Sequence, residues 1–157
     1  EMDVYRFRHE TCHAYQDYLI NKAYSGTNWY EDALESRVNT PYAKLFKFCY
    51  DLRNQNITNT RGLTTWGNQP EYNDIQSKRS RNAVRATEDA NDLINMYLWN
   101  PDYFDLYMDY LSVNIRGYSK ENVEADDLTP LSKQQASVLR NIVIDYVNEM
   151  RREISHF

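Results

Sequence analysis

The chain of 157 residues contains only four glycines and four prolines. Many-stranded sandwiches and barrels need a turn roughly every ~8–12 residues, and so few turn-forming residues cannot supply those turns. Hydrophobic residues make up 41% of the chain and charged residues 26%, which is typical of a globular protein rather than a disordered one. We therefore expect a mainly α fold of five or six helices, forming one domain over residues 1–157.

The spacing of apolar residues and the local start and stop signals predict where these helices lie. The expected ranges are 4–24, 29–38, 41–52, 80–99, 101–111 and 131–154. Asn28 with Glu31 three residues later is typical of a helix N-terminus, and Pro41 and Pro101 are typical of a first turn. The second and third ranges could also form one kinked helix. Residues 54–74 read as a long loop with room for a short hairpin at 63–66.

Charge and cysteine content exclude several classes of function. The net charge is −5 and the pI is near 5.2, which argues against nucleic acid as a partner, because phosphate binding needs clustered cations. Cys12 and Cys49 are the only cysteines, so a zinc site of four thiolates is excluded. No apolar run reaches the ~18–20 residues of a membrane span, and no signal peptide is visible. We expect a soluble protein of unknown compartment without a membrane role.

Chemistry concentrates in the segment F-R-H-E-T-C-H-A-Y-Q at residues 7–16, which contains H-E-x-x-H. Residues four apart on a helix point the same way, so His9 and His13 can both bind one zinc ion. Glu10 is turned aside, where it can act as a general base on a water that the zinc activates. The competing interpretation is a pair of surface or core histidines without a metal.

A catalytic zinc site needs a third protein ligand, and no histidine follows until His156. The candidates are the carboxylates of the second predicted helix, which are Glu31, Asp32 and Glu35. Glu31 follows His13 by 31 − 13 = 18 positions, and it could instead only cap its helix.

H-E-x-x-H on one helix, followed about twenty residues later by Glu31, resembles the gluzincin metallopeptidases. The H-A-Y-Q continuation is similar to one found in many small bacterial zincins. The resemblance covers about residues 5–36 and implies a peptidase with zinc held by His9, His13 and Glu31, and with Glu35 orienting a ligand histidine. It also implies a β-sheet ahead of the motif that binds a peptide or protein substrate.

Only eight residues precede His9, so the chain resembles the helical part of a gluzincin without that sheet. A missing upstream segment or a partner chain would have to supply it. For Glu31 to reach the metal, the first helix should end near residues 19–22, because a longer helix brings Glu35 nearer instead.

Other features are less specific. The basic stretch 77–85 is followed by Glu88, Asp89 and Asp92, which predicts a solvated, ion-paired helix face. Residues 54–74, with Trp66, form a candidate lid, and fourteen tyrosines offer no means of choosing an oxyanion donor. The motif and its resemblance leave two expected functions. The first is a zinc-dependent metallopeptidase with Glu10 as general base. The second is a non-catalytic helical structural or interaction protein, viral or phage in origin, with a structural or vestigial zinc site.

Overall fold

The computed structural model describes residues 2–23, 28–55, 64, 69–112 and 131–154. Within these ranges every regular element is a helix and no strand occurs, which confirms the mainly α fold. The elements in chain order are α1 (Met2–Ala23), α2 (Trp29–Leu34), α3 (Pro41–Asn54), the 3-10 helix η2 (Pro70–Asp74), α5 (Lys78–Trp99), α6 (Pro101–Leu111) and α7 (Lys133–Ile154). None of the helices in these ranges combines the length and the apolar character needed to cross a membrane.

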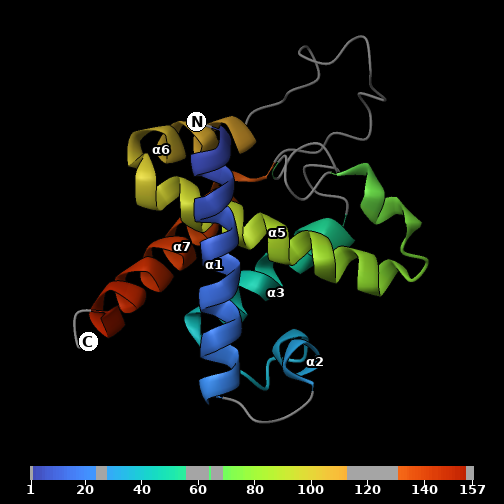
Figure 1. Ribbon diagram of the computed structural model, residues 1–157. Helices are drawn as coiled ribbons and strands as arrows, with labels where there is room; N and C mark the ends of the chain where they lie inside the picture. Colours follow the sequence, from blue (N-terminus) through green and yellow to red (C-terminus); the bar gives the residue numbers. More distant parts are fainter. Residues whose placement is uncertain (1, 24–27, 56–63, 65–68, 113–130, 155–157) are drawn as a thin grey trace.

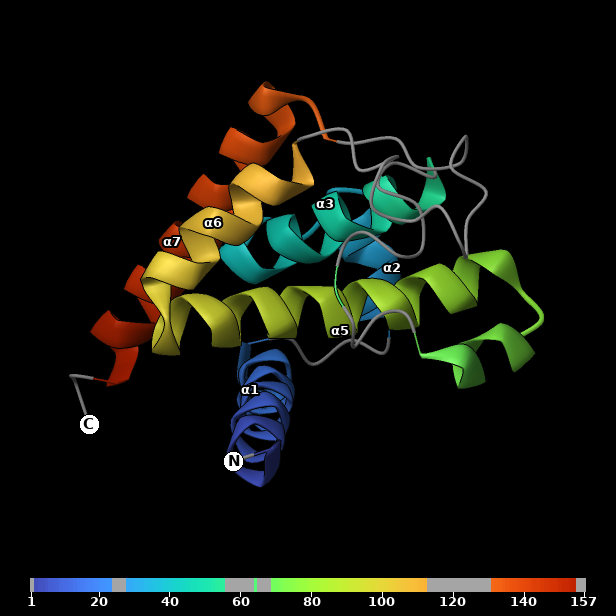
Figure 2. The ribbon, with the colours of Figure 1, turned by 90° about the horizontal axis from the view of Figure 1, so that it is seen from above.

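Helix α5 lies at the centre of the arrangement. α3 packs along one side of it, and α1 crosses the opposite side (Figures 1 and 2). α6 and α7 contact each other and α5, while α2 packs on α3. α5 is therefore the element on which both the core and the motif-bearing helix α1 rest.

The apolar core is shared by α3, α5, α6 and α7. Its fully buried members include Leu45, Phe46, Leu93, Ile94, Phe104, Leu139 and Val143. Burying each such side chain contributes about 1.5–3 kcal/mol. Among the described side chains of α1, only Cys12 belongs to the buried apolar set. Polar contacts, rather than apolar burial, therefore hold most of α1 against the molecule.

Local signals explain where several helices begin. The Thr40 hydroxyl accepts a hydrogen bond from the backbone N–H of Ala43 ahead of Pro41, and the Asn100 side chain accepts one from Tyr103 ahead of Pro101. Such N-caps satisfy backbone donors that the first helical turn leaves open. The predicted starts of α3 and α6 are thus confirmed.

The second predicted helix differs from expectation. α2 ends at Leu34 rather than near residue 38, and six residues separate it from α3, so the two are not one kinked helix. Ser36 has φ of 62°, a left-handed conformation that ends a helix at once. The Asn28 side chain makes no capping hydrogen bond, and only its backbone carbonyl, which accepts from the N–H of Asp32, starts the helix.

The last helix begins later than expected, at Lys133 rather than residue 131. Ser132 and Gln135 exchange side-chain-to-backbone hydrogen bonds of 2.8 and 3.0 Å, which is a capping box. Most of the predicted loop at 54–74, including the possible hairpin and Trp66 of the candidate lid, lies outside the described residues.

Candidate metal centre

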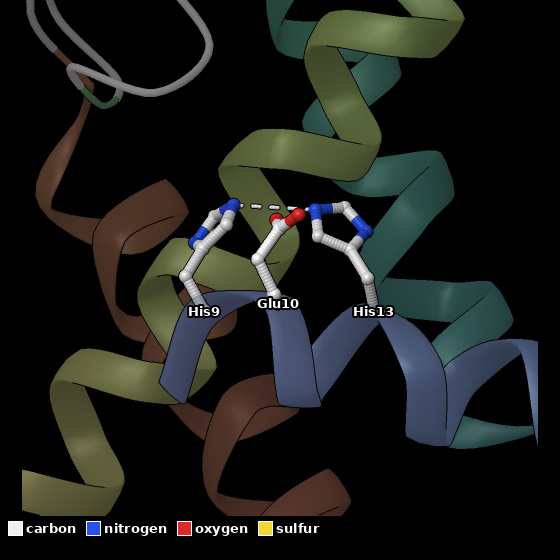
Figure 3. A group of neighbouring side chains, drawn as sticks. All are labelled: His9, Glu10 and His13. Atoms are coloured by element: carbon white, nitrogen blue, oxygen red, sulfur yellow. Dashed lines mark hydrogen bonds between the residues drawn. The ribbon is translucent and has the colours of Figure 1, made fainter. Parts of the chain in front are cut away.

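His9 and His13 lie one turn apart on α1 and face the same way, as their spacing predicts (Figure 3). Their ring centroids are 4.8 Å apart with an interplanar angle of 71°, and the two Nε2 atoms are 3.2 Å apart. His9 is fully buried and His13 is partly buried. Two ring nitrogens therefore converge at the interface between α1 and α5.

A carboxylate from the central helix completes this convergence. Glu88 of α5 places Oε1 at 2.7 Å from Nε2 of His9 and 3.1 Å from Nε2 of His13. The three atoms form a triangle, and four-coordinate zinc with bonds of ~2.0–2.1 Å holds its ligand atoms about 3.3 Å apart. The spacing in this structure thus fits a single ion, while hydrogen bonds from the imidazoles to Glu88 account for the same distances without one.

Glu10 is exposed, yet it points to the same side of α1 as the two imidazoles, and its carboxylate lies between them in the view of Figure 3. One donor atom from each of His9, Glu10 and His13 falls within 4.8 Å of the other two. The three residues of the predicted motif are therefore brought together as a group that could hold a metal ion.

Charges at the centre are strongly coupled. Burial disfavours the ionised form of Glu88, but hydrogen bonds from His13 and His9 outweigh it and lower the pKa of Glu88 to about 2. Burial likewise opposes the charge on His13, yet the bond to Glu88, with the nearby charges of Glu88, Glu10 and Asp17, raises the pKa of His13. Glu88 is thus a carboxylate at neutral pH, the form that binds metals.

A buried amide orients one of the imidazoles. Nδ2 of Asn91 lies 3.0 Å from Nδ1 of His13, and also within 3.0 Å of the carbonyl of Thr87 and 3.3 Å of the hydroxyl of Tyr42. When His13 Nδ1 accepts from Asn91, the ring proton sits on Nε2 and points to Glu88. A histidine that binds a metal through Nε2 instead carries its proton on Nδ1 and donates it to an acceptor. Metal binding by His13 would therefore need the Asn91 amide turned so that its Oδ1 faces Nδ1.

Tyr72 of η2 reaches the same carboxylate, since its hydroxyl hydrogen bonds with Glu88. Burial, followed by the charges of Glu88, Glu71 and Glu10, raises the pKa of Tyr72 to about 12. Tyr72 is therefore a protonated hydroxyl beside the centre. Nothing in the sequence distinguishes it from the other tyrosines among the fourteen.

A further polar contact joins α1 to α5 one turn before the motif. The Tyr5 hydroxyl donates to Oδ1 of Asp92, and Nδ2 of Asn95 contacts the carbonyl of Tyr5 at 3.5 Å. Burial is the main reason that the pKa of Asp92 rises to about 6, and the negative charge of Asp92 adds to burial in raising the pKa of Tyr5.

Glu31 lies apart from the triangle of donor atoms. Its carboxylate accepts two hydrogen bonds from Arg79, of 2.9 and 2.8 Å, and that bond is the main reason that its pKa is lowered. α1 continues to Ala23, beyond the 19–22 limit set above, and Glu35 pairs with Arg37 at 2.5 Å. A hollow of about 530 Å³ nevertheless has Glu31, His13 and Glu88 in its lining, and the ligand role of Glu31 stays a prediction.

The predicted solvated face on α5 is wrong. Asp89 and Asp92 are buried, and the side chain of Glu88 is only 17% exposed. Asp89 forms two hydrogen bonds of 2.7 Å with Arg53 and accepts another from Thr64. These acids pair with residues from other elements rather than with the basic stretch before them, because α5 is enclosed by α1 and α3.

No family model, curated protein or solved structure matches this chain. The gluzincin resemblance therefore stays a prediction, and the case for function rests on the geometry of the centre itself.

Proposed function

We propose that the chain is a zinc-dependent hydrolase whose metal ion is held by His9, His13 and Glu88. The observation that carries this proposal is the convergence of two Nε2 atoms and one carboxylate oxygen within 3.2 Å of one another. Peptide bonds are the substrate class that the H-E-x-x-H motif favours.

Glu88 is preferred to Glu31 as the third ligand because of the partners that each carboxylate has. Glu88 already contacts both imidazoles, whereas Glu31 is engaged with Arg79. Two histidines with one carboxylate are a donor set that catalytic zinc uses. The third ligand would thus be a carboxylate, as the sequence predicts, but on α5 instead of α2.

Zinc in such a site lowers the pKa of a water toward ~7 and polarises a substrate carbonyl. Glu10, exposed and beside the histidines, would take the proton of the attacking water and pass it to the leaving amine. Tyr72, protonated at neutral pH and beside Glu88, would donate a hydrogen bond to the oxygen on which negative charge develops in the transition state. Glu10 and Tyr72 thus supply the proton transfers and the donor that amide hydrolysis needs.

The hollow beside the centre supports access for a substrate. Its volume of about 530 Å³ lies in the range of small-molecule sites, and His13 and Glu88 form part of its wall. A peptide side chain entering there would also meet Arg79 and Glu31, which offer one charge of each sign.

The first test is the metal content of protein purified without chelator. We expect about one equivalent of zinc, lost in His9→Ala and Glu88→Gln and retained in Glu31→Gln. The reverse result for the two glutamates would assign the third ligand to Glu31. Less than about half an equivalent, unchanged in His9→Ala, would contradict a metal centre of any kind.

The second test separates catalysis from metal binding. Glu10→Gln should keep the zinc and lose turnover of a peptide library, with Glu35→Gln as a matched control of unchanged activity. Retained turnover in Glu10→Gln would remove the general base and with it the proposed mechanism.

A structural zinc site is the second candidate, and the thin apolar attachment of α1 favours it. An ion bound between His9 and His13 of α1 and Glu88 of α5 would join two helices that otherwise share little buried apolar surface. A structural site has a closed coordination sphere. Hydroxamate binding to the zinc protein indicates catalysis, and its absence with zinc bound indicates a structural role.

A further inference from the structure

A second cavity lies away from the metal centre, where the second half of α1 meets α2, α3 and α7. Its volume is about 170 Å³, and none of the proposed zinc ligands lines it. For scale, an apolar cavity of about 150 Å³ accommodates benzene. The space therefore suits one small organic group.

Aromatic rings form the inner wall of this cavity. Trp29 and Tyr42 stack with centroids 5.8 Å apart, and Tyr42 contacts Tyr146 at 5.7 Å. These residues are 6%, 4% and 3% exposed, so protein covers most of each ring and the cavity borders the remainder. Faces of aromatic rings attract cations as well as apolar groups.

Two buried hydrogen-bonding atoms that have no partner among the described residues also belong to the lining. Gln16 is 3% exposed, donates through Nε2 to the hydroxyl of Tyr146, and has no described partner for Oε1. The hydroxyl of Tyr15 is likewise buried without a described partner. A buried acceptor that makes no hydrogen bond costs free energy. Oε1 of Gln16 is therefore suited to a ligand that donates an N–H or O–H.

The charged residues in the lining are all acidic. Glu149 and Glu153 stand one turn apart on α7, and the lining includes no Lys or Arg. After burial, the charge of Glu153 is the largest cause of the raised pKa of Tyr15, and Glu149 also contributes. Both carboxylates therefore act on the hydroxyl at this cavity.

We propose that this cavity binds a primary ammonium group carried on a small apolar body. The ammonium would donate to Oε1 of Gln16 and to the carboxylates of Glu149 and Glu153, and the apolar body would lie against Trp29, Tyr42 and Tyr146. The two carboxylates attract a cation and repel an anion, whereas a neutral ligand gains nothing from their charge. This site is independent of the proposed hydrolase activity and of any metal.

The test is an NMR titration of the whole chain with phenethylamine, followed at the side-chain amide of Gln16 and the indole N–H of Trp29. We expect saturable shifts at both signals and binding about tenfold weaker for 2-phenylethanol, which lacks the charge. Shifts with n-butylamine test the need for an aromatic body, and Nα-acetyl-lysine methylamide tests whether the amine can come from a lysine side chain.

Charge variants on α7 provide the control. Glu149→Gln/Glu153→Gln should weaken phenethylamine binding about tenfold and leave 2-phenylethanol unchanged, while Asp145→Asn, an exposed acid on the same helix that is not in the lining, should change neither. Equal binding of the amine and the alcohol, an unaffected double variant, or no shift at Gln16 and Trp29 at about 10 mM amine would each overturn the proposal.

Discussion

The two sides of α5 are held in opposite ways. On the side of α3, apolar side chains and the enclosed pair Arg53–Asp89 form the contact. On the side of α1, the contact is made by hydrogen bonds of His9, His13 and Tyr5 to polar groups of α5. Apolar burial depends little on solution conditions near neutral pH, whereas bonds to histidines and carboxylates depend on protons and metals. One side of the helix thus provides stability and the other can respond to a ligand.

The largest expected effect comes from breaking the ion pair on the α3 side. Arg53→Met removes both guanidinium hydrogen bonds to the buried carboxylate of Asp89 and leaves Thr64 as its described hydrogen-bond donor, with Arg85 as a nearby charge. We expect the free energy of unfolding to fall by about 3–5 kcal/mol. Lys47→Met, which breaks a half-exposed pair with Asp51 on the same helix, is the control and should cost less than about 0.5 kcal/mol. Urea unfolding measures both, and equal losses would contradict the contrast between enclosed and exposed pairs.

The next effect concerns pH on the α1 side. The pKa of Asp92 is about 6 in the fold against 3.8 for the free group, so the fold favours the protonated carboxyl. Stability that Asp92 contributes is present below pH 3.8 and is lost as the pH rises to about 6. Asp92→Asn should therefore gain up to about 3 kcal/mol relative to the parent between pH 3.5 and 7.

Thermal or urea unfolding of both proteins across that pH range provides the measurement. Glu88 and the other carboxylates titrate in both proteins, so the difference between them isolates Asp92. A difference that stays constant with pH, or that shrinks as the pH rises, would show that the Asp92 carboxyl is not disfavoured as a charge in the fold.

Zinc binding should reduce the difference in the free energy of opening between α1 and α5. In metal-free protein we expect the amides of α1 to exchange with solvent at a lower free energy of opening than those of α5, because α1 has so little buried apolar surface. Zinc at about 100 times its dissociation constant should raise the opening free energy of α1 by about 2.7 kcal/mol and leave exposed α6 amides unchanged. The same protection in His9→Ala would exclude the centre as its cause.

The smallest effect is that of a single hydrogen bond. Tyr5→Phe removes the bond to Asp92 but keeps the ring, and we expect a loss of about 1 kcal/mol confined to the exchange of α1. A loss spread over α3 and α7 would mean that α1 and the core unfold together rather than separately.

Features encoded by neighbouring residues could be predicted from the sequence. The starts of α3 and α6 follow from Pro41 and from Asn100 with Pro101, and the pairing of His9 with His13 follows from helical spacing alone. In each case the residues that interact lie within four positions, so the geometry of one helix decides the outcome.

Contacts between distant residues could not be predicted in the same way. Glu88 lies 75 positions after His13, and the basic residues before it offered nearer partners that it does not use. The residues of α5 that face α1, at positions 88, 91, 92 and 95, recur at helical spacing between buried apolar residues. That recurrence was the available signal for an enclosed polar stripe, but it does not say which element covers the stripe.

Because Glu88 and Asp89 are adjacent and have partners on opposite sides of α5, the length of this helix is constrained as well as its composition. Neighbouring residues on a helix project about 100° apart, which lets consecutive acids reach His9 on one side and Arg53 on the other. A single residue inserted or deleted in the middle of α5 would turn the following half of the helix by that angle and misalign every partner beyond it. Substitutions along α5 can therefore be absorbed one at a time, whereas a change in its length would alter both the candidate metal centre and the core.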